Sequence, residues 1–219
     1  RALEPLSRFE AAIAWPLYHL NRLILRGLFR LRVSGLDNLS VSGPVIIAPN
    51  HASVLDPFVL CAALPYSTLR RTCFTGWTGM AFANPLFRVF ARLARALPIE
   101  QARAAFSSLA LPLAALRRES NVVWFPEGAR SPDGTLRTFM PGIGILLETY
   151  PVAVVPTSIS GTFEAMPTGR RLPRLRPLSV RFGRARLPSD LAEIGHGDKP
   201  SQRITDALHG EVESLMREA

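Results

Sequence analysis

The strongest constraint on the fold is a short apolar run that leads directly into a polar segment. Residues 45–48 are apolar at every position, which is typical of a parallel strand covered on both faces. Further strand candidates are residues 122–125, 152–159 and 178–182. Helical spacing is predicted for residues 58–64, 82–97, 102–118 and 201–218. Strands that alternate with helices predict an α/β fold with a mostly parallel central sheet flanked by helices.

The length of the chain favours one domain with an additional segment before it. With 219 residues, the chain can bury one core without disulfides or a structural metal. We assign residues 1–34 to an N-terminal amphipathic helical segment and residues 35–219 to the folded domain. Cys61 and Cys73 belong to no closely spaced cysteine cluster, so we expect two buried thiols. The sequence starts with Arg1, which suits a processed chain or a piece of a longer polypeptide.

Residues 6–31 combine apolar side chains with regularly spaced arginines. Arg22, Arg26 and Arg30 recur every four residues, which predicts a basic amphipathic helix. A membrane-spanning helix needs about 20 mostly apolar residues, and the arginines interrupt this segment too often for that. Two interpretations stay open. The helix lies in a lipid interface with its arginines at the headgroups, or it packs on its own domain.

The net charge of +9 comes almost entirely from arginine, because Lys199 is the only lysine. Such an excess favours an anionic partner such as nucleic acid, a phosphorylated metabolite or an acidic membrane surface. The alternative is a generally basic protein with no special partner. Residues 170–186 contain seven arginines and no acidic residue. This stretch is either a solvated loop or a neighbour of a phosphate or membrane site.

A histidine and a carboxylate follow the apolar run of residues 45–48. His51 and Asp56 are five residues apart, and on one helix they would point about 140° away from each other. We therefore predict a strand, a turn and a helix, with Asp56 as N-cap, Ser53 as the alternative cap and Pro57 in the first helical position. Asp56 can then accept a hydrogen bond from one ring nitrogen of His51 and leave the other basic. Because no serine or cysteine has the spacing of a nucleophile, His51 is predicted to be a general base for a substrate hydroxyl.

A second polar segment follows the strand candidate at residues 122–125. It contains Glu127, Gly128 and Arg130. Ligands of open α/β sheets bind beyond the carboxyl ends of the strands, so we expect this segment and His51 to share one crevice. Gly128 permits a tight turn or the close approach of a ligand. Arg130 offers a planar fork of donors for phosphate.

Together, these segments resemble the signature of a known family. Asn50-His51-x-Ser53-x-x-Asp56 and Phe125-Pro126-Glu127-Gly128-x-Arg130-Ser131 are similar to the first and third blocks of the glycerolipid acyltransferases related to lysophosphatidic acid acyltransferase. Val154-Val155-Pro156 is similar to the fourth block. The resemblance extends over residues 35–182, and it identifies residues 35–219 as an acyltransferase domain.

The resemblance implies transfer of a fatty acyl group from an acyl thioester, on coenzyme A or acyl carrier protein, to the free hydroxyl of a lysophospholipid in phospholipid biosynthesis or remodelling. His51 and Asp56 would be the catalytic residues. The substrate-binding residues would be Glu127, Gly128, Arg130, Ser131, Arg103 and Pro156. The resemblance further implies association with an anionic membrane surface on its cytoplasmic face. No nucleic acid, metal or organic cofactor is expected.

Two departures from the family pattern bear on the acceptor. Ala129 stands where the third block usually has threonine, and Glu100 and Gln101 stand near the usual arginine of the second block, which displaces Arg103. The expected acceptor is 1-acylglycerol-3-phosphate, with a lysophospholipid of larger headgroup as the alternative. A thioester hydrolase, and a non-catalytic basic module that binds membrane or nucleic acid, are the other hypotheses.

Overall fold

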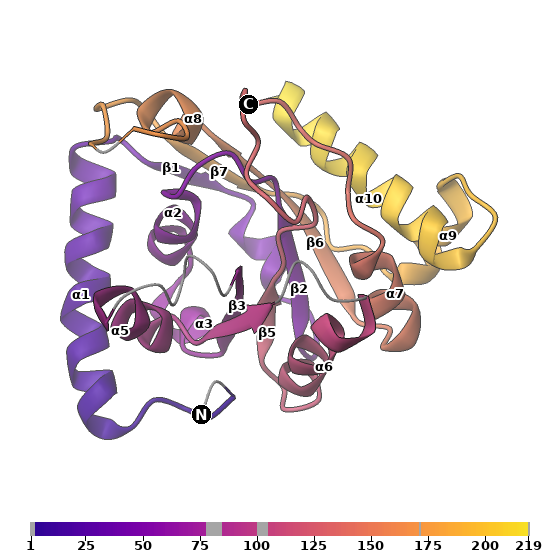
Figure 1. The fold of residues 1–219 in the computed structure, drawn as a ribbon, viewed down its shortest axis with the longest axis horizontal. Coiled ribbons are helices and arrows are strands. Elements are labelled where there is room, and N and C mark those ends of the chain that lie inside the picture. The colour runs from indigo at the N-terminus through magenta and orange to yellow at the C-terminus, as the bar shows by residue number, and fades with distance from the viewer. Residues whose placement is uncertain (1–2, 78–84, 100–104, 171, 219) are drawn as a thin grey trace.

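The computed structural model describes residues 3–77, 85–99, 105–170 and 172–218, and a seven-stranded sheet lies at the centre of this part of the chain (Figure 1). The strands are β1 (Arg32–Ser34), β2 (Val45–Pro49), β3 (Thr72–Trp77), β4 (Ala96–Ile99), β5 (Asn121–Val123), β6 (Ala153–Ser160) and β7 (Ser179–Phe182). Their order in space is β1-β7-β6-β2-β5-β3-β4. Only β6 and β7 pair antiparallel among the described neighbours. The predicted fold class, a mostly parallel sheet flanked by helices, is confirmed.

Helices cover the sheet on both faces (Figure 1). They are α1 (Arg8–Gly27), α2 (Asp56–Ala63), α3 (Tyr66–Leu69), α5 (Pro85–Leu93), α6 (Ala105–Leu116), α7 (Gly142–Thr149), α8 (Thr162–Ala165), α9 (Pro188–Ile194) and α10 (Pro200–Arg217), with the short 3-10 helix η1 (Leu36–Leu39). In Figure 1, α1 stands along one side of the molecule and α9 and α10 along the other.

The central strand β2 shows why residues 45–48 are apolar throughout. Val45 and Ile47 belong to the core beside α1 and α2, whereas Ile46 and Ala48 belong to the core beside α6, α7 and α10. Successive side chains of a strand point to opposite faces, so β2 needs apolar residues at every position. Complete burial of one isoleucine contributes about 1.5–3 kcal/mol.

Helix α1 packs on its own domain with one face. Tyr18 donates its hydroxyl to the Leu64 carbonyl oxygen at 3.0 Å, and Asn21 donates to the Phe58 carbonyl oxygen at 2.8 Å. The start of α1 is tied to α5, because Arg92 donates to both carboxylate oxygens of Glu10. These hydrogen bonds make the largest contribution to lowering the pKa of Glu10 to about 2.

The rest of the surface of α1 carries exposed apolar side chains. Phe9 is 76% exposed, Leu23 is 70% exposed and Trp15 is 53% exposed. Packing on the domain therefore accounts for only part of the apolar surface of this helix. None of the helices in the described ranges has both the length and the apolarity that crossing a bilayer requires.

The structure corrects several predicted element boundaries. The helix predicted over residues 82–97 ends as α5 at Leu93, and β4 follows from Ala96; residues 82–84 lie outside the described ranges. Arg95 has φ +53°, a left-handed conformation that turns the chain between these two elements. The strands β1 and β3 were not predicted from the sequence. Both cysteines are free, with Cys73 buried and Cys61 half-buried.

Candidate active site

Asn50 fixes the point where the chain leaves β2. Its Nδ2 donates to the Ile159 carbonyl oxygen at 3.0 Å, and its Oδ1 accepts the Ile159 N–H at 2.7 Å. Since β2 and β6 are neighbours in the sheet, this buried amide locks the end of one strand to the end of the other. Sequence reasoning gave Asn50 no role of its own, although a polar residue at a strand end, directly before His51, was a usable signal.

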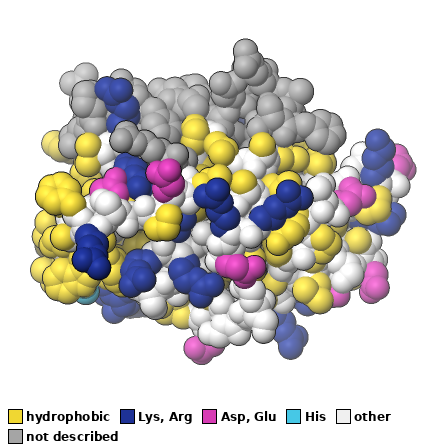
Figure 2. Space-filling model, turned by 90° about the horizontal axis from the view of Figure 1, so that it is seen from below, with side chains coloured by type: hydrophobic (Ala, Val, Ile, Leu, Met, Phe, Trp, Pro, Cys, Tyr) yellow, Lys and Arg dark blue, Asp and Glu magenta, His cyan; other side chains and the backbone are white. Residues whose placement is uncertain are grey.

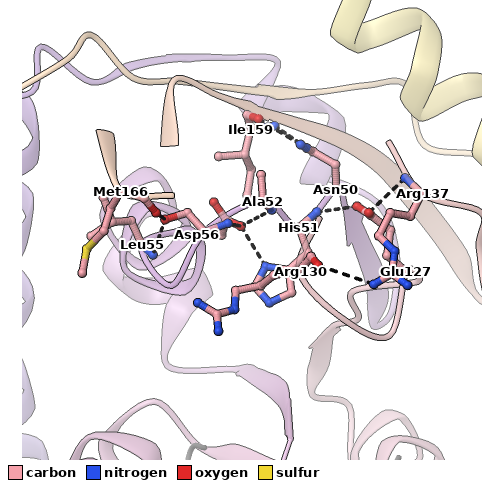
Figure 3. Close-up of polar contacts among 11 residues, drawn as sticks. Asn50, His51, Ala52, Leu55, Asp56, Glu127, Arg130, Arg137, Ile159 and Met166 are labelled. Carbon is pink, nitrogen blue, oxygen red and sulfur yellow. Dashed lines mark hydrogen bonds and ion pairs between the residues drawn. The ribbon is translucent and has the colours of Figure 1, made fainter. Parts of the chain in front are cut away.

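His51 and Asp56 lie in contact, as their spacing predicted (Figure 3). The Nδ1 of His51 is 2.8 Å from the Oδ2 of Asp56. The same oxygen accepts the N–H groups of Ala52 and Ser53, each at 2.8 Å. Because a carboxylate oxygen can only accept here, Nδ1 is the ring nitrogen that donates to Asp56, and in the neutral ring Nε2 then has the lone pair.

Asp56 is shielded from solvent, whereas His51 is partly accessible. The Asp56 side chain is completely buried, whereas 18% of the His51 side chain is exposed. The His51 ring packs against Phe125 with 4.2 Å between ring centroids. A base that is held from inside and reachable from outside can take a proton from a bound hydroxyl.

The predicted helix cap is wrong by one residue. Asp56 is the first residue of α2, Leu55 is the N-cap, and no side chain caps the helix. The carboxylate of Asp56 instead turns back toward the N–H groups of Ala52 and Ser53, which precede the helix. The turn therefore uses this carboxylate to orient His51 rather than to start α2.

Glu127 joins the two polar segments behind His51. Its Oε1 accepts the His51 N–H at 2.6 Å, and its Oε2 accepts the Arg137 N–H at 3.0 Å. The residue is only 3% exposed. Burial raises the pKa of Glu127 to about 7, although these two N–H groups and the charge of Arg137 act in the opposite direction. The expected contact between Glu127 and the acceptor stays a prediction.

Gly128 lies in a tight turn of the loop after β5, which is one of the two roles that the sequence allows for it. Gly128 has φ +70°, and a Cβ on it would lie 3.1 Å from the Cγ of Met140. Ser131 is 1% exposed, its N–H donates to the His51 carbonyl oxygen at 2.7 Å, and its hydroxyl donates to Asp133 at 2.9 Å. Ser131 thus holds the loop beside His51, and its expected contact with substrate stays a prediction.

Two arginines flank Glu127 in this loop. Arg130 is half-buried, and in Figure 3 its side chain points away from Glu127. The Arg137 guanidinium donates to the Arg130 carbonyl oxygen at 3.4 Å. Arg137 was not a predicted site residue, and no spacing rule connects it with Glu127 ten positions earlier. The loop therefore offers one predicted cation, Arg130, and one that only the structure reveals.

Among the described residues, the predicted site residue Pro156 is not part of this cluster. Pro156 lies buried inside β6, opposite Ala48 of β2, and its carbonyl oxygen accepts the Gly183 N–H at 2.8 Å. Arg103 lies outside the described ranges. A surface cavity of about 420 Å³ is lined by residues such as Val41, Pro151 and Asp190. It lies beside the amino ends of β2 and β6, whereas His51 follows the carboxyl end of β2.

Comparison with known proteins agrees with this site. Residues 30–160 match the family described as Acyltransferase. Over 144 residues the chain is 31% identical to the 1-acyl-sn-glycerol-3-phosphate acyltransferase LPAT1, chloroplastic, of Arabidopsis thaliana, covering 64% of this chain and 39% of that protein. It is 30% identical over 144 residues to BAT2, chloroplastic, of Brassica napus, a protein with the same enzyme name, covering 64% of this chain and 40% of that protein. The chain spans about two fifths of the length of these relatives.

A solved structure has the same fold. The crystal structure of the 1-acyl-sn-glycerophosphate (LPA) acyltransferase PlsC from Thermotoga maritima superposes with a TM-score of 0.71 at 18% sequence identity. The match covers 97% of this chain and 84% of that chain. The fold and the match to the family place this chain in the acyltransferase family. It is related to the glycerolipid O-acyltransferases, as its motifs indicated.

Proposed function

We propose that this protein transfers a fatty acyl group from an acyl thioester to the free hydroxyl of a lysophospholipid, with 1-acylglycerol-3-phosphate as the preferred acceptor. The donor would be acyl-CoA or an acyl carrier protein thioester, in phospholipid biosynthesis or remodelling. The observation that carries the proposal is the buried Asp56 carboxylate, whose Oδ2 faces the Nδ1 of His51 at 2.8 Å. The names of the relatives support the choice of acceptor.

The proposed reaction starts with proton removal by His51. Its Nε2 takes the proton of the acceptor hydroxyl, and the Asp56 carboxylate stabilises the resulting imidazolium. The acceptor oxygen attacks the thioester carbonyl carbon and forms an ester bond as the carbon–sulfur bond breaks. The thiolate leaves with the electron pair of that bond and takes the proton back from Nε2. Each step uses only this chain and the two substrates.

Arg130 is the proposed anchor for the acceptor phosphate. A guanidinium suits phosphate because it donates two parallel hydrogen bonds and keeps its charge at every working pH. The loop around Arg130 is fixed on both sides, by the Ser131 N–H on His51 and by the Arg137 guanidinium on the Arg130 carbonyl oxygen. A fixed loop holds the phosphate at a constant distance from the base.

The exposed face of α1 supports a membrane location. Figure 2 shows hydrophobic side chains gathered at the left edge of the molecule, where α1 lies, with basic side chains beside them. Arg26 and Arg30 are exposed near the end of the same helix. A helix with this composition binds in the interfacial layer of an anionic bilayer, where lysophospholipids reside. Location at the cytoplasmic face stays a prediction.

An acceptor screen with one labelled acyl thioester tests the proposed activity. The acceptors are lysophosphatidic acid, a zwitterionic lysophospholipid and a neutral monoacylglycerol, and the measured quantity is the rate of diacyl product. We expect the highest rate with lysophosphatidic acid. Preference for the zwitterionic lipid would indicate that the acceptor is a lysophospholipid with a larger headgroup. Thiol release that does not depend on any acceptor would indicate a thioester hydrolase.

The chain offers a matched control for His51. His196 also faces an aspartate, with its Nδ1 3.0 Å from the Oδ2 of Asp206, but its side chain is 92% exposed. We expect His51→Ala to abolish acyl transfer and His196→Ala to leave it unchanged. Circular dichroism should show that both variant proteins are folded. Equal activity of the folded His51→Ala protein would contradict the assignment of the base.

A further inference from the structure

A short basic segment after α8 combines exposed arginines with exposed leucines. We call residues 168–176 the arginine loop; residue 171 lies outside the described ranges. Arg170, Arg174 and Arg176 are exposed, and Leu172 and Leu175 are 75% and 63% exposed. The loop contains no acidic residue. Nothing in the proposed reaction uses these side chains.

The topology places the arginine loop on the same side of the molecule as His51, at the carboxyl ends of β2 and β6; we call this side the site edge of the sheet. β2 and β6 are parallel, so the turn with His51 and the segment after β6 both lie at the site edge. The loop returns along the site edge to β7, which is antiparallel to β6. Contact with the turn is direct, because the Ser53 hydroxyl donates to the Met166 carbonyl oxygen at 2.7 Å, two residues before the loop.

The site edge also contains the end of α1. The Leu178 N–H donates to the Phe29 carbonyl oxygen at 3.0 Å, and the Arg32 N–H donates to the Leu178 carbonyl oxygen at 2.9 Å. Leu28, the residue after α1, is 59% exposed. Backbone hydrogen bonds therefore hold the residues just after the arginine loop to the residues just after α1, and Figure 1 draws the segment after α8 beside the top of α1.

We infer that the arginine loop is a second lipid-binding element, separate from the face of α1, which binds the anionic bilayer that contains the acceptor. The inference rests on the proposed membrane location and specifies how the active site is oriented there. Arginines attract the headgroups of anionic lipids, and the leucines between them insert into the interfacial layer. Two attachment points, α1 and the loop, turn the site edge toward the bilayer.

The exposed leucines favour a lipid over a nucleic acid as the partner. Binding to a phosphate backbone needs only the cations, and leucines offer no aromatic face on which bases stack. A bilayer gives both residue types a function, because it presents phosphate at its surface and hydrocarbon beneath.

The test compares the binding of loop variants to vesicles. The proteins are wild type, Arg174→Glu/Arg176→Glu and Leu172→Ser/Leu175→Ser. The charge-matched control is Arg117→Glu/Arg118→Glu, which changes two exposed arginines after α6. Sedimentation with vesicles of phosphatidylcholine and phosphatidylglycerol in a 3:1 ratio, against phosphatidylcholine alone, measures binding. Thermal unfolding shows that each variant is folded.

We expect the arginine variant to lose about 30-fold or more of its binding to the anionic vesicles and the leucine variant to lose a similar factor on both vesicle types. The control should bind like wild type. Equal binding by wild type and both loop variants, or an equal loss by the control, would overturn the inference. The inference would also be overturned if wild type bound a single-stranded RNA oligonucleotide more tightly than the anionic vesicles, and if only the loop variants lost this RNA binding.

Acyl transfer to a short-chain lysophosphatidic acid below its aggregation concentration separates this inference from the proposed activity. The loop variants should keep the wild-type rate with that dispersed acceptor and lose rate only with acceptor embedded in vesicles. If the loop variants also lose the rate with dispersed acceptor, the loop acts on the site and not on the membrane. If wild type transfers no acyl group in either format, the proposed activity fails while vesicle binding is still measured.

Discussion

Replacing Asp56 by asparagine tests the proposed base without removing its contacts. The Oδ2 of Asp56 meets only donors, namely the His51 Nδ1–H and the N–H groups of Ala52 and Ser53. An asparagine NH₂ group in that place would face three donors, so the amide oxygen takes the position of Oδ2. The Nδ1 tautomer of His51 is then kept, and only the negative charge is lost.

The size of the effect follows from the loss of this charge. A hydrogen bond to a charged group is worth about 1.5–3 kcal/mol and a neutral one about 0.5–1.5 kcal/mol, so the imidazolium formed during catalysis loses about 1–2 kcal/mol. Since about 1.4 kcal/mol corresponds to a tenfold change in rate, we expect Asp56→Asn to lower kcat/KM by about 5–30-fold. The change should lie in kcat rather than in the acceptor KM.

Asp56→Ala provides the contrast. It leaves the buried N–H groups of Ala52 and Ser53 without an acceptor, which costs about 1–3 kcal/mol each in the free energy of unfolding. We expect Asp56→Ala to be destabilised by about 2–6 kcal/mol. Asp56→Asn should be destabilised much less, because it keeps the acceptor oxygen and because the Oδ1 position, where its NH₂ group would lie, has no hydrogen-bond partner within the described ranges even in wild type. Urea denaturation measures both values.

Two results would refute this reasoning. Wild-type kcat/KM in a folded Asp56→Asn protein would show that the carboxylate charge does not assist His51. A loss of about 10⁴-fold, the size expected when the tautomer is wrong, would show that the amide had turned its NH₂ group toward the ring. Asp206→Asn, in the exposed pair with His196, is the control and should keep full activity.

Three further predictions concern the loop after β5. Arg130→Ala should raise KM for lysophosphatidic acid by about 10–100-fold with little change in kcat, and an unchanged KM in steady-state assays would remove Arg130 from the phosphate site. The pKa of Glu127 is raised to about 7, so its protonated form favours the folded state below pH 4.5 and this contribution is lost as the pH rises through 7. Wild type should therefore lose about 2–3 kcal/mol of unfolding free energy relative to Glu127→Gln between pH 4.5 and 8, and parallel pH profiles in urea denaturation would contradict this. Gly128→Ala, which forces φ +70° on a residue with a Cβ 3.1 Å from Met140, should lower the free energy of unfolding by about 1–3 kcal/mol, and an unchanged midpoint would show that the loop relaxes.

The sequence predicts the central strands better than the edge of the sheet. The strand β2 is buried on both faces, so every residue from 45 to 48 shows its burial in the sequence. The strand β4 lies at the edge, and Ala96 and Leu97 also suit a helix. Its identity depends on pairing with β3 and on the turn at Arg95, and neither is visible in a local pattern.

The same limit applies to the site. The contact between His51 and Asp56 was predictable because both residues lie in one short turn. Glu127 is 76 residues from His51, and its two acceptor oxygens face backbone N–H groups, which every residue except proline carries. A side chain that binds backbone leaves no complementary residue type in the sequence. Spacing can therefore indicate that Glu127 matters but not that it orients the segment with His51.

Comparison of the two histidine–aspartate pairs shows where the chemistry of this site originates. His51–Asp56 and His196–Asp206 share the same atoms and nearly the same distance, 2.8 and 3.0 Å. Asp206 is half-exposed, and it also accepts the His196 N–H. Asp56 is completely buried and accepts two further N–H groups that fix its orientation. A weakly solvated, immobile carboxylate stabilises an imidazolium more than a hydrated one does, so the proposed role of His51 as base depends on the turn that encloses the pair and not on the pair alone.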